Sequence, residues 1–160
     1  MTTPTGPGRR KARLIRDEPL VEDALVVLRA AAADRPRTVR NAVADATESG
    51  LTYVVVRPNG DREVLYGLSV FAQRADHTVA DTLRTFMWAP HYLRLTAGEI
   101  RAGGFELFAT GANPDHYDIA VLPGRIEHDP APTPAELLEA VDRLLAIAGQ
   151  LHPNPAYTAS

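Results

Sequence analysis

Two β-rich runs joined by an Asn-Gly turn constrain the fold of this chain more than any other feature. The first run, L-T-Y-V-V-V, covers residues 51–56, and the second, R-E-V-L-Y-G-L-S-V-F-A, covers residues 62–72. Between them, Asn59-Gly60 supplies the positive φ angles that a tight hairpin turn needs. Gly67 interrupts the second run, which predicts a bulge or a close backbone approach. The sequence therefore predicts an antiparallel hairpin in the middle of the chain.

Apolar residues spaced by three and four positions predict helices around this hairpin. Acidic residues begin the first such pattern and Leu20, Ala24, Val27, Leu28 and Ala31 continue it, so we expect a helix from about Glu18 to Ala33. The other expected helices cover residues 38–49, the segment between Thr78 and Pro90, a short stretch from Thr96 to Gly103, and residues 133–150. In the segment after Thr78, the expected inner face consists of Val79, Leu83, Phe86 and Met87. The last helix begins with T-P-A-E, which forms a capping box.

Three further strands complete the expected fold. They cover residues 92–96, 105–110 and 116–122, and a Gly-Ala-Asn-Pro-Asp turn joins the last two. The element order is α-α-β-β-α-β-α-β-β-α, which predicts an α+β fold with an antiparallel or mixed sheet of about five strands and helices packed on one face. We expect a flexible basic arm at 1–16, one domain at 17–150 and a loose tail at 151–160.

Composition narrows the class of protein. The 160 residues suffice for one self-sufficient core, and no cysteine is present, which removes disulfides and thiolate chemistry. No apolar run is long enough to span a bilayer and the N-terminus lacks a secretory h-region, so we expect a cytoplasmic protein. Sixteen of the seventeen basic residues are Arg, an excess typical of GC-rich, and here we expect bacterial, coding. Residues 1–40 carry a charge of +4 and the remainder −7, which argues against sequence-independent nucleic-acid binding by the body.

The turn between the last two expected strands carries the candidate catalytic residues. Thr110, Asn113 and His116 would surround this hairpin tip. An imidazole titrates near neutral pH, so His116 is a candidate general acid or base. Asp118 lies two residues further, on the same strand face, where it could orient the ring. The alternative is a half-exposed histidine at a strand end, and the His-x-Asp pair lacks a third ligand, so we predict no metal and no cofactor.

A second candidate site binds phosphate or another anion. Thr96 and Gly98 open the short helix, whose free amides could hold an anion, and Arg94 and Arg101 flank it. The alternatives are an ordinary Thr N-cap and solvated ion pairs. Aromatic residues also gather around Pro90; stacking on a base is possible for them, but core packing is the commoner arrangement. They are Phe86, Trp88, His91 and Tyr92.

The run E-I-R-A-G-G-F-E-L at 99–107, followed by H-Y-D-I-A-V at 116–121, resembles part of the HicA-type toxins. These are small ribonucleases with a fold similar to double-stranded RNA-binding domains. The resemblance implies that His116 matches the functional histidine of that family. It covers under a fifth of the chain, and the chain departs from the family in its acidic body and in the four residues between Gly111 and His116.

Two functions remain after this reading. Phosphate-loop, dinucleotide, zinc-protease and serine-hydrolase motifs are absent from the sequence. We expect an interaction module that binds a protein partner or forms a homo-oligomer, with no membrane association. The alternative is a toxin-like, RNA-directed enzyme that uses His116, Asp118 and Thr110, with Arg94 and Arg101 holding phosphate.

Overall fold

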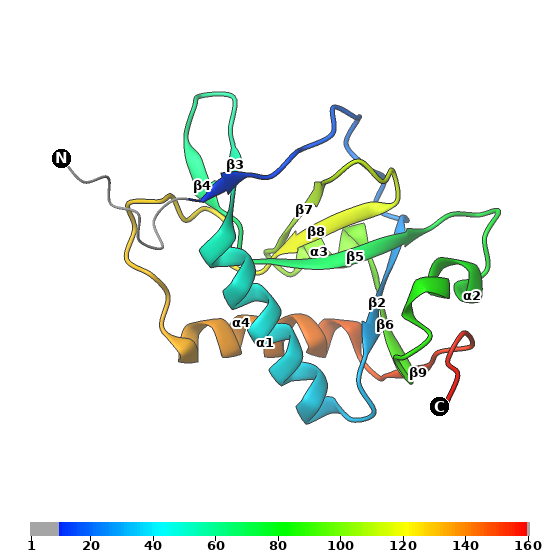
Figure 1. Cartoon of the computed structure of the whole chain (residues 1–160). Helices are drawn as coiled ribbons and strands as arrows, with labels where there is room; N and C mark the ends of the chain where they lie inside the picture. The colour runs from blue at the N-terminus through cyan, green and yellow to red at the C-terminus, as the bar shows by residue number, and fades with distance from the viewer. Residues whose placement is uncertain (1–9, 160) are drawn as a thin grey trace.

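The computed structural model describes residues 10–159, which form two sheets and four α-helices (Figure 1). The strands are β1 (Lys11–Ala12), β2 (Val26–Ala31), β3 (Tyr53–Val56), β4 (Arg62–Val64), β5 (Gly67–Gln73), β6 (His91–Thr96), β7 (Glu106–Ala109), β8 (His116–Ala120) and β9 (His152–Pro153), and the helices are α1 (Arg35–Thr52), α2 (Val79–Thr82), α3 (Ala97–Ala102) and α4 (Pro134–Ala148), with a 3-10 turn η1 (Arg84–Phe86). The α+β class is confirmed.

The larger sheet has six strands in the order β7-β8-β5-β2-β6-β9, and every neighbouring pair is antiparallel. The smaller sheet has the order β1-β3-β4, with β1 parallel to β3. Helices α1 and α4 pack against each other and lie together below β5 in Figure 1. Apolar side chains from these two helices and from the larger sheet form the main core, which includes Leu68, Val70, Leu93, Val141 and Leu144.

The prediction of a helix over residues 18–33 is wrong. Residues 26–31 form β2, a central strand paired on one side with β5 and on the other with β6. Val27 and Leu28 are both buried, although they point to opposite faces of the sheet. A strand covered on both faces has a continuous apolar run, and such a run cannot be distinguished from a buried helix by spacing alone.

The helix expected over residues 38–49 is confirmed as the longer α1. Asp34 is its N-cap and accepts a hydrogen bond from the Arg37 amide at 2.8 Å. Small residues on its buried face let the helix approach the sheet closely. At Gly50, a Cβ atom would lie 2.2 Å from the Tyr66 ring, so no larger residue fits there without a shift.

The central hairpin is confirmed between β3 and β4, with Gly60 at a φ of 91°. The second β-rich run divides at Gly67 into β4 and β5, which belong to different sheets. A Cβ atom at Gly67 would lie 3.1 Å from Leu65 Cγ and 3.3 Å from an Asp118 side-chain oxygen, so side chains, and not the expected backbone, approach this glycine closely. One run therefore connects the two sheets and leads directly to the strand beside Asp118.

The segment between Thr78 and Pro90 is less helical than expected. Thr78 and Asp81 form the full capping box, but α2 ends after four residues and η1 follows. Leu83 is buried as the apolar pattern predicts. Met87, expected on the inner face, is half-exposed because the irregular chain after η1 does not keep the helical period.

Both ends of the described chain pair with sheets. Lys11–Ala12, within the expected arm, pair with β3, and His152–Pro153, within the expected tail, pair with β6. Asn154 is buried and its side-chain amide donates hydrogen bonds to the Phe86 and Ala89 carbonyls. Residues 1–9 of the expected arm lie outside the described residues. No helix within 10–159 has the length and apolar character needed to cross a membrane.

Candidate functional site

The hairpin tip between β7 and β8 is built from residues 110–116. Gly111 adopts a φ of 76°, which an L side chain rarely adopts. The Asn113 side chain accepts a hydrogen bond from the Asp115 amide at 2.9 Å, and the His116 amide donates to the Asn113 carbonyl at 3.0 Å. The turn expected from the sequence is therefore present, and it brings both ends of the tip close together.

The structure brings Thr110, His116 and Asp118 into one hydrogen-bonded chain. His116 Nδ1 lies 3.0 Å from the Thr110 hydroxyl and 3.1 Å from the Thr110 carbonyl. The same hydroxyl donates to Asp118 Oδ2 at 2.8 Å, so it accepts from the histidine. Asp118, expected from the sequence to orient the ring, is thus linked to it through the Thr110 hydroxyl.

The hydrogen bonds from His116 to Thr110 fix the tautomer of the histidine ring. Both partners of Nδ1 act as acceptors toward it, which places the proton of a neutral ring on Nδ1 and a lone pair on Nε2. No residue within 10–159 forms a hydrogen bond with Nε2. The ring is half-buried and packs edge-on against Phe71 at a centroid distance of 5.2 Å. An oriented imidazole with a free Nε2 can accept or deliver a proton.

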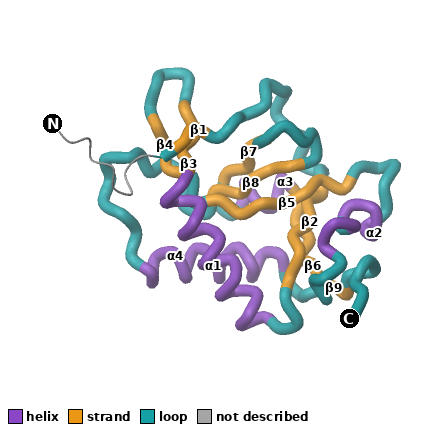
Figure 2. The backbone as a smooth tube through the Cα atoms, viewed as in Figure 1, coloured by secondary structure: helices purple, strands orange, loops and turns teal. Residues whose placement is uncertain are grey.

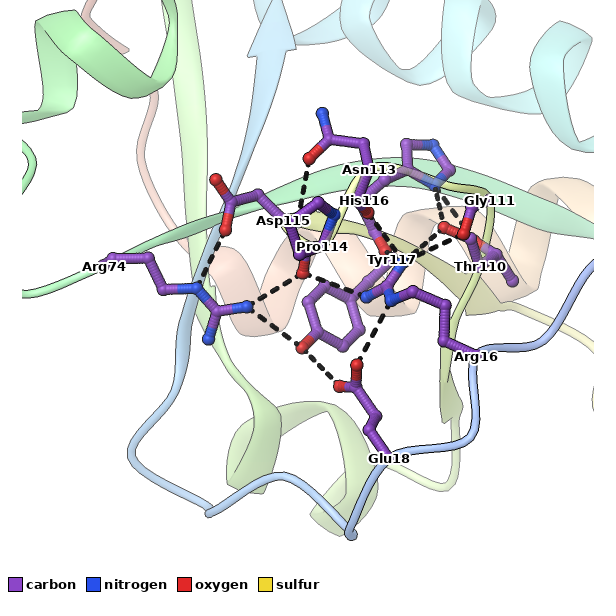
Figure 3. Close-up of polar contacts among 10 residues, drawn as sticks. All are labelled: Arg16, Glu18, Arg74, Thr110, Gly111, Asn113, Pro114, Asp115, His116 and Tyr117. Atoms are coloured by element: carbon purple, nitrogen blue, oxygen red, sulfur yellow. Dashed lines mark hydrogen bonds and ion pairs between the residues drawn. The ribbon is translucent and has the colours of Figure 1, made fainter.

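Arg16 holds the backbone of the hairpin tip. Its Nη1 atom lies 2.6 to 2.8 Å from the carbonyl oxygens of Thr110, Asn113 and His116, and its Nη2 atom lies 3.0 Å from that of Pro114 (Figure 3). These carbonyls converge on one guanidinium, whose planar fork presents several donors at once. We call this set of carbonyls, together with that of Gly111 at 3.5 Å, the carbonyl nest.

A second polar cluster lies beneath the nest, around the Tyr117 hydroxyl (Figure 3). This hydroxyl donates to Glu18 at 2.8 Å, and Glu18 also accepts from Arg16 Nε at 3.1 Å. Arg74 contacts the tip from the other side, with bonds to Asp115 at 2.8 Å and to the Pro114 carbonyl at 2.9 Å. Burial is the largest cause that raises the pKa of Tyr117, and the hydrogen bond to Glu18 raises this pKa further. The phenol therefore stays neutral.

A charged cluster at the far end of β7 joins the two sheets. Arg57 forms a bidentate pair with Glu106 and a further bond to Glu63 at 2.7 Å. Burial alone would raise the pKa of Glu63, but hydrogen bonds from Arg57 and from the Gly124 amide hold this pKa below its ordinary value. The charged side chains of this cluster all have partners of opposite charge within it, so we assign the cluster a structural role.

The expected anion site does not form. The Thr96 hydroxyl caps α3 by accepting from the Glu99 amide, and the Gly98 amide donates to the Asp23 carbonyl. Arg101 pairs with the Asp23 carboxylate at 2.9 Å, and Arg94 is exposed on β6. Of the first-turn amides of this six-residue helix, those of Ala97 and Gly98 are therefore occupied by the segment that leads into β2, which the sequence predicted as a helix, and that of Glu99 is occupied by Thr96.

Aromatic side chains near Pro90 are only partly in the core. Trp88, expected to be packed inside, is 67% exposed, and Phe86 packs edge-on against it at 6.1 Å. Tyr157 is 43% exposed, and the amide of its neighbour Thr158 donates to the Met87 carbonyl at 3.0 Å. We call Met87, Trp88 and Tyr157 the aromatic patch. Sequence reasoning missed it because residues 151–160 were expected to be loose.

Sequence reasoning also missed Arg16. Nothing in the pattern R-L-I-R-D-E distinguishes this arginine from the others in the expected arm. Its carbonyl partners lie 94 or more positions away along the chain, so only the folded arrangement identifies it. Among residues 10–159, no group of three or more His, Asp or Glu side chains is placed to hold a metal ion.

Comparisons of the chain with protein-family models, with curated proteins and with solved structures returned no match. The local resemblance to HicA-type toxins thus stays a hypothesis carried by its own residues, and any function must be argued from the geometry of the surfaces described above.

Proposed function

We propose that this protein is an interaction module that binds a protein partner through the aromatic patch. One observation carries this proposal: Trp88 is 67% exposed although it is a large apolar side chain, and half-exposed Met87 and Tyr157 accompany it. Trp, Tyr and Met are enriched at the centres of protein interfaces, and Trp and Tyr dominate the residues whose truncation costs most binding energy. The patch therefore has the composition of a binding hot spot.

The backbone around the patch is pre-organised. Asn154 holds the two segments together: its side chain donates to the Phe86 and Ala89 carbonyls, and its own amide donates to the Pro90 carbonyl at 3.0 Å. The Asn154 side chain also accepts from the Ala156 amide at 2.9 Å. Because these bonds fix the backbone on both sides of the patch, less conformational entropy is lost when a partner docks.

Charge favours a protein over a nucleic acid as the partner of the patch. The chain carries a net charge of −3, and its basic excess lies within residues 1–40, which do not include the patch. Nucleic-acid affinity comes mainly from many phosphate contacts by basic side chains. An apolar centre of aromatic residues instead gains affinity by burial of its own surface.

Site-specific photo-crosslinking tests this proposal. A benzophenone amino acid would replace Trp88, and in a matched control it would replace Leu138, which is 49% exposed on α4. After irradiation in cells, we expect one defined protein adduct from position 88 and none from position 138. Adding Tyr157→Ala should reduce the adduct at least about fivefold, since hot-spot truncation costs more than 1 kcal/mol.

The masses of the adducts identify the partner. An adduct of twice the chain mass would identify a second copy, and a different mass would identify another protein. Absence of adducts at position 88, or equal adducts at both positions, would overturn the assignment of the patch as a docking surface.

A second candidate function is favoured by the hydrogen-bonded residues His116, Thr110 and Asp118. It gives His116 a fixed tautomer and a free Nε2, which a toxin-like, RNA-directed enzyme needs for proton transfer. The test is growth of a bacterial host that expresses the wild type or His116→Ala. Trp88→Ala, which lies outside these three hydrogen-bonded residues, is the control. Growth arrest by the wild type and the Trp88 variant, relieved by His116→Ala, would support catalysis. Normal growth with the wild type removes this candidate.

A further inference from the structure

Residues 10–18, which we call the strap, cross the rest of the molecule as a bound extended peptide would. Figure 2 shows the chain after β1 as a loop that runs toward the β7–β8 hairpin. Its main chain forms sheet-like hydrogen bonds with both sheets: the Arg13 amide donates to the Val54 carbonyl at 2.7 Å, and the Arg16 amide donates to the Ala109 carbonyl at 2.9 Å. The Leu14 carbonyl accepts from the Gly111 amide at 3.0 Å. Added strands use this mode of recognition.

Arg13 and Arg16, three positions apart, anchor the middle of the strap, and at its start Arg10 Nε donates to the Gly50 carbonyl at 2.6 Å. Arg16 enters the carbonyl nest and lies over the Tyr117 ring at 5.1 Å. Arg13 lies over the Tyr53 ring at 4.4 Å, and its Nε is 3.4 Å from the Asp118 carboxylate, which is only 3% exposed. Each guanidinium therefore has an aromatic surface on one side and oxygen acceptors at its edge.

The side chains between the anchors are less covered than the anchors themselves. Leu14 is 60% exposed and Ile15 is 37% exposed, whereas the side chains of Arg13 and Arg16 are 24% and 14% exposed. Selectivity along the strap therefore comes from the two guanidinium sites and from the main-chain bonds. The Arg13 site is the weaker of the two, because its buried Nε forms an ion pair but no hydrogen bond within residues 10–159.

We propose that the surface beneath the strap is a recognition groove for an extended Arg-x-x-Arg segment of a partner protein, and that Arg13 to Arg16 occupy it in cis. The groove consists of Tyr53, Asp118, Tyr117 and the carbonyl nest. At the two guanidinium positions it presents acceptors and aromatic faces, which suits a guanidinium better than an ammonium point charge. This inference concerns a surface different from the aromatic patch and does not depend on it.

Occupation in cis makes the groove selective. A tethered segment competes at an effective concentration of about millimolar, so a partner segment must present both arginines to displace the strap. Pro19 and Leu20 follow the strap directly and are exposed, Leu20 by 83%. Displacement of the strap about these two residues is therefore sterically feasible. The groove thus binds partners only when the strap has moved aside.

Cutting the strap from the folded chain tests this inference. A specific protease site would be inserted between Pro19 and Leu20 of the full chain, and the chain would be cut after folding. A fluorescent peptide that copies residues 10–18 would then be added, and its exchange with the cut strap measured by anisotropy. A second peptide with Lys at the positions of Arg13 and Arg16, and with Arg10 kept, is the matched control.

We expect the cut strap to stay bound in the native structure and to exchange with the labelled copy. The Lys peptide should compete at least about tenfold more weakly, because it cannot present the planar fork. Loss of the native far-UV circular dichroism after cutting would overturn the inference, since the strap would then be an integral part of the fold. Equal competition by the Lys peptide would also overturn it, as would an uncut dimer in which a second copy supplies the strap.

Discussion

The two hairpin connections within residues 10–159 are built in opposite ways. Residues 57–61 join β3 to β4, and the hydrogen bonds that hold their backbone are local: the Arg57 amide donates to the Asp61 carbonyl at 2.9 Å, and the Asn59 side chain accepts from the Asp61 amide at 2.9 Å. Residues 110–115 join β7 to β8, and the carbonyls in and beside them are held by Arg16 from the distant strap. One turn is encoded within five residues, and the other requires the folded chain.

This difference separates structure that local chemistry specifies from structure that tertiary contacts specify. An Asn-Gly pair between two β-rich runs has a favoured turn geometry in any context. The second connection has a Gly and an Asn as well, but its carbonyls converge on one guanidinium. The Arg16 bonds to the Thr110 and His116 carbonyls are partly buried, and a buried polar group that loses its donor costs free energy, so the second turn depends on an arginine that no local pattern indicates.

Arg16→Ala should give the largest effect, because it removes the donor on which the second connection depends. We expect the free energy of unfolding to fall by about 2 kcal/mol, within the range for partly buried polar groups that lose their hydrogen-bond donor. Arg16→Lys restores the charge but not the fork and should recover less than half of this loss. Urea unfolding followed by circular dichroism measures both variants.

The control for this experiment is Arg40→Ala, an exposed arginine on α1, which should change stability by less than about 0.5 kcal/mol. A loss below about 1 kcal/mol for Arg16→Ala would show that the tip holds its shape without the guanidinium, and the contrast between the two connections would disappear.

The same contrast explains how much the sequence predicts. Elements with local signals were predicted: the Thr133 capping box begins α4, the Thr96 capping box begins α3, and the Asn-Gly turn joins β3 to β4. The sequence could not place β2, because the sheet buries both of its faces and removes the alternation of a half-exposed strand. Tertiary pairing on two sides outweighed the apparent helical period there.

The candidate site follows the same division. Thr110, His116 and Asp118 lie near one another in sequence, and the structure brings them together as hairpin geometry predicts. Arg94 and Arg101 do not join them, since Arg101 pairs with Asp23 from the segment that precedes β2. Proximity along the chain was a reliable guide within one hairpin and failed as soon as a different element supplied the partner.

The smallest expected effect concerns coupling between each turn and the strap. Gly60 and Gly111 both have positive φ angles, and neither would bring a Cβ into a steric clash, so Gly60→Ala and Gly111→Ala should each cost about 1 kcal/mol of strain. The Gly111 change alters the backbone at the carbonyl nest, whereas the Gly60 change does not. In double-mutant cycles with Arg16→Ala, Gly111→Ala should therefore be non-additive by about 0.5 to 1 kcal/mol, and Gly60→Ala should be additive. Equal coupling for the two glycines would mean that Arg16 stabilises the whole sheet and not the tip in particular.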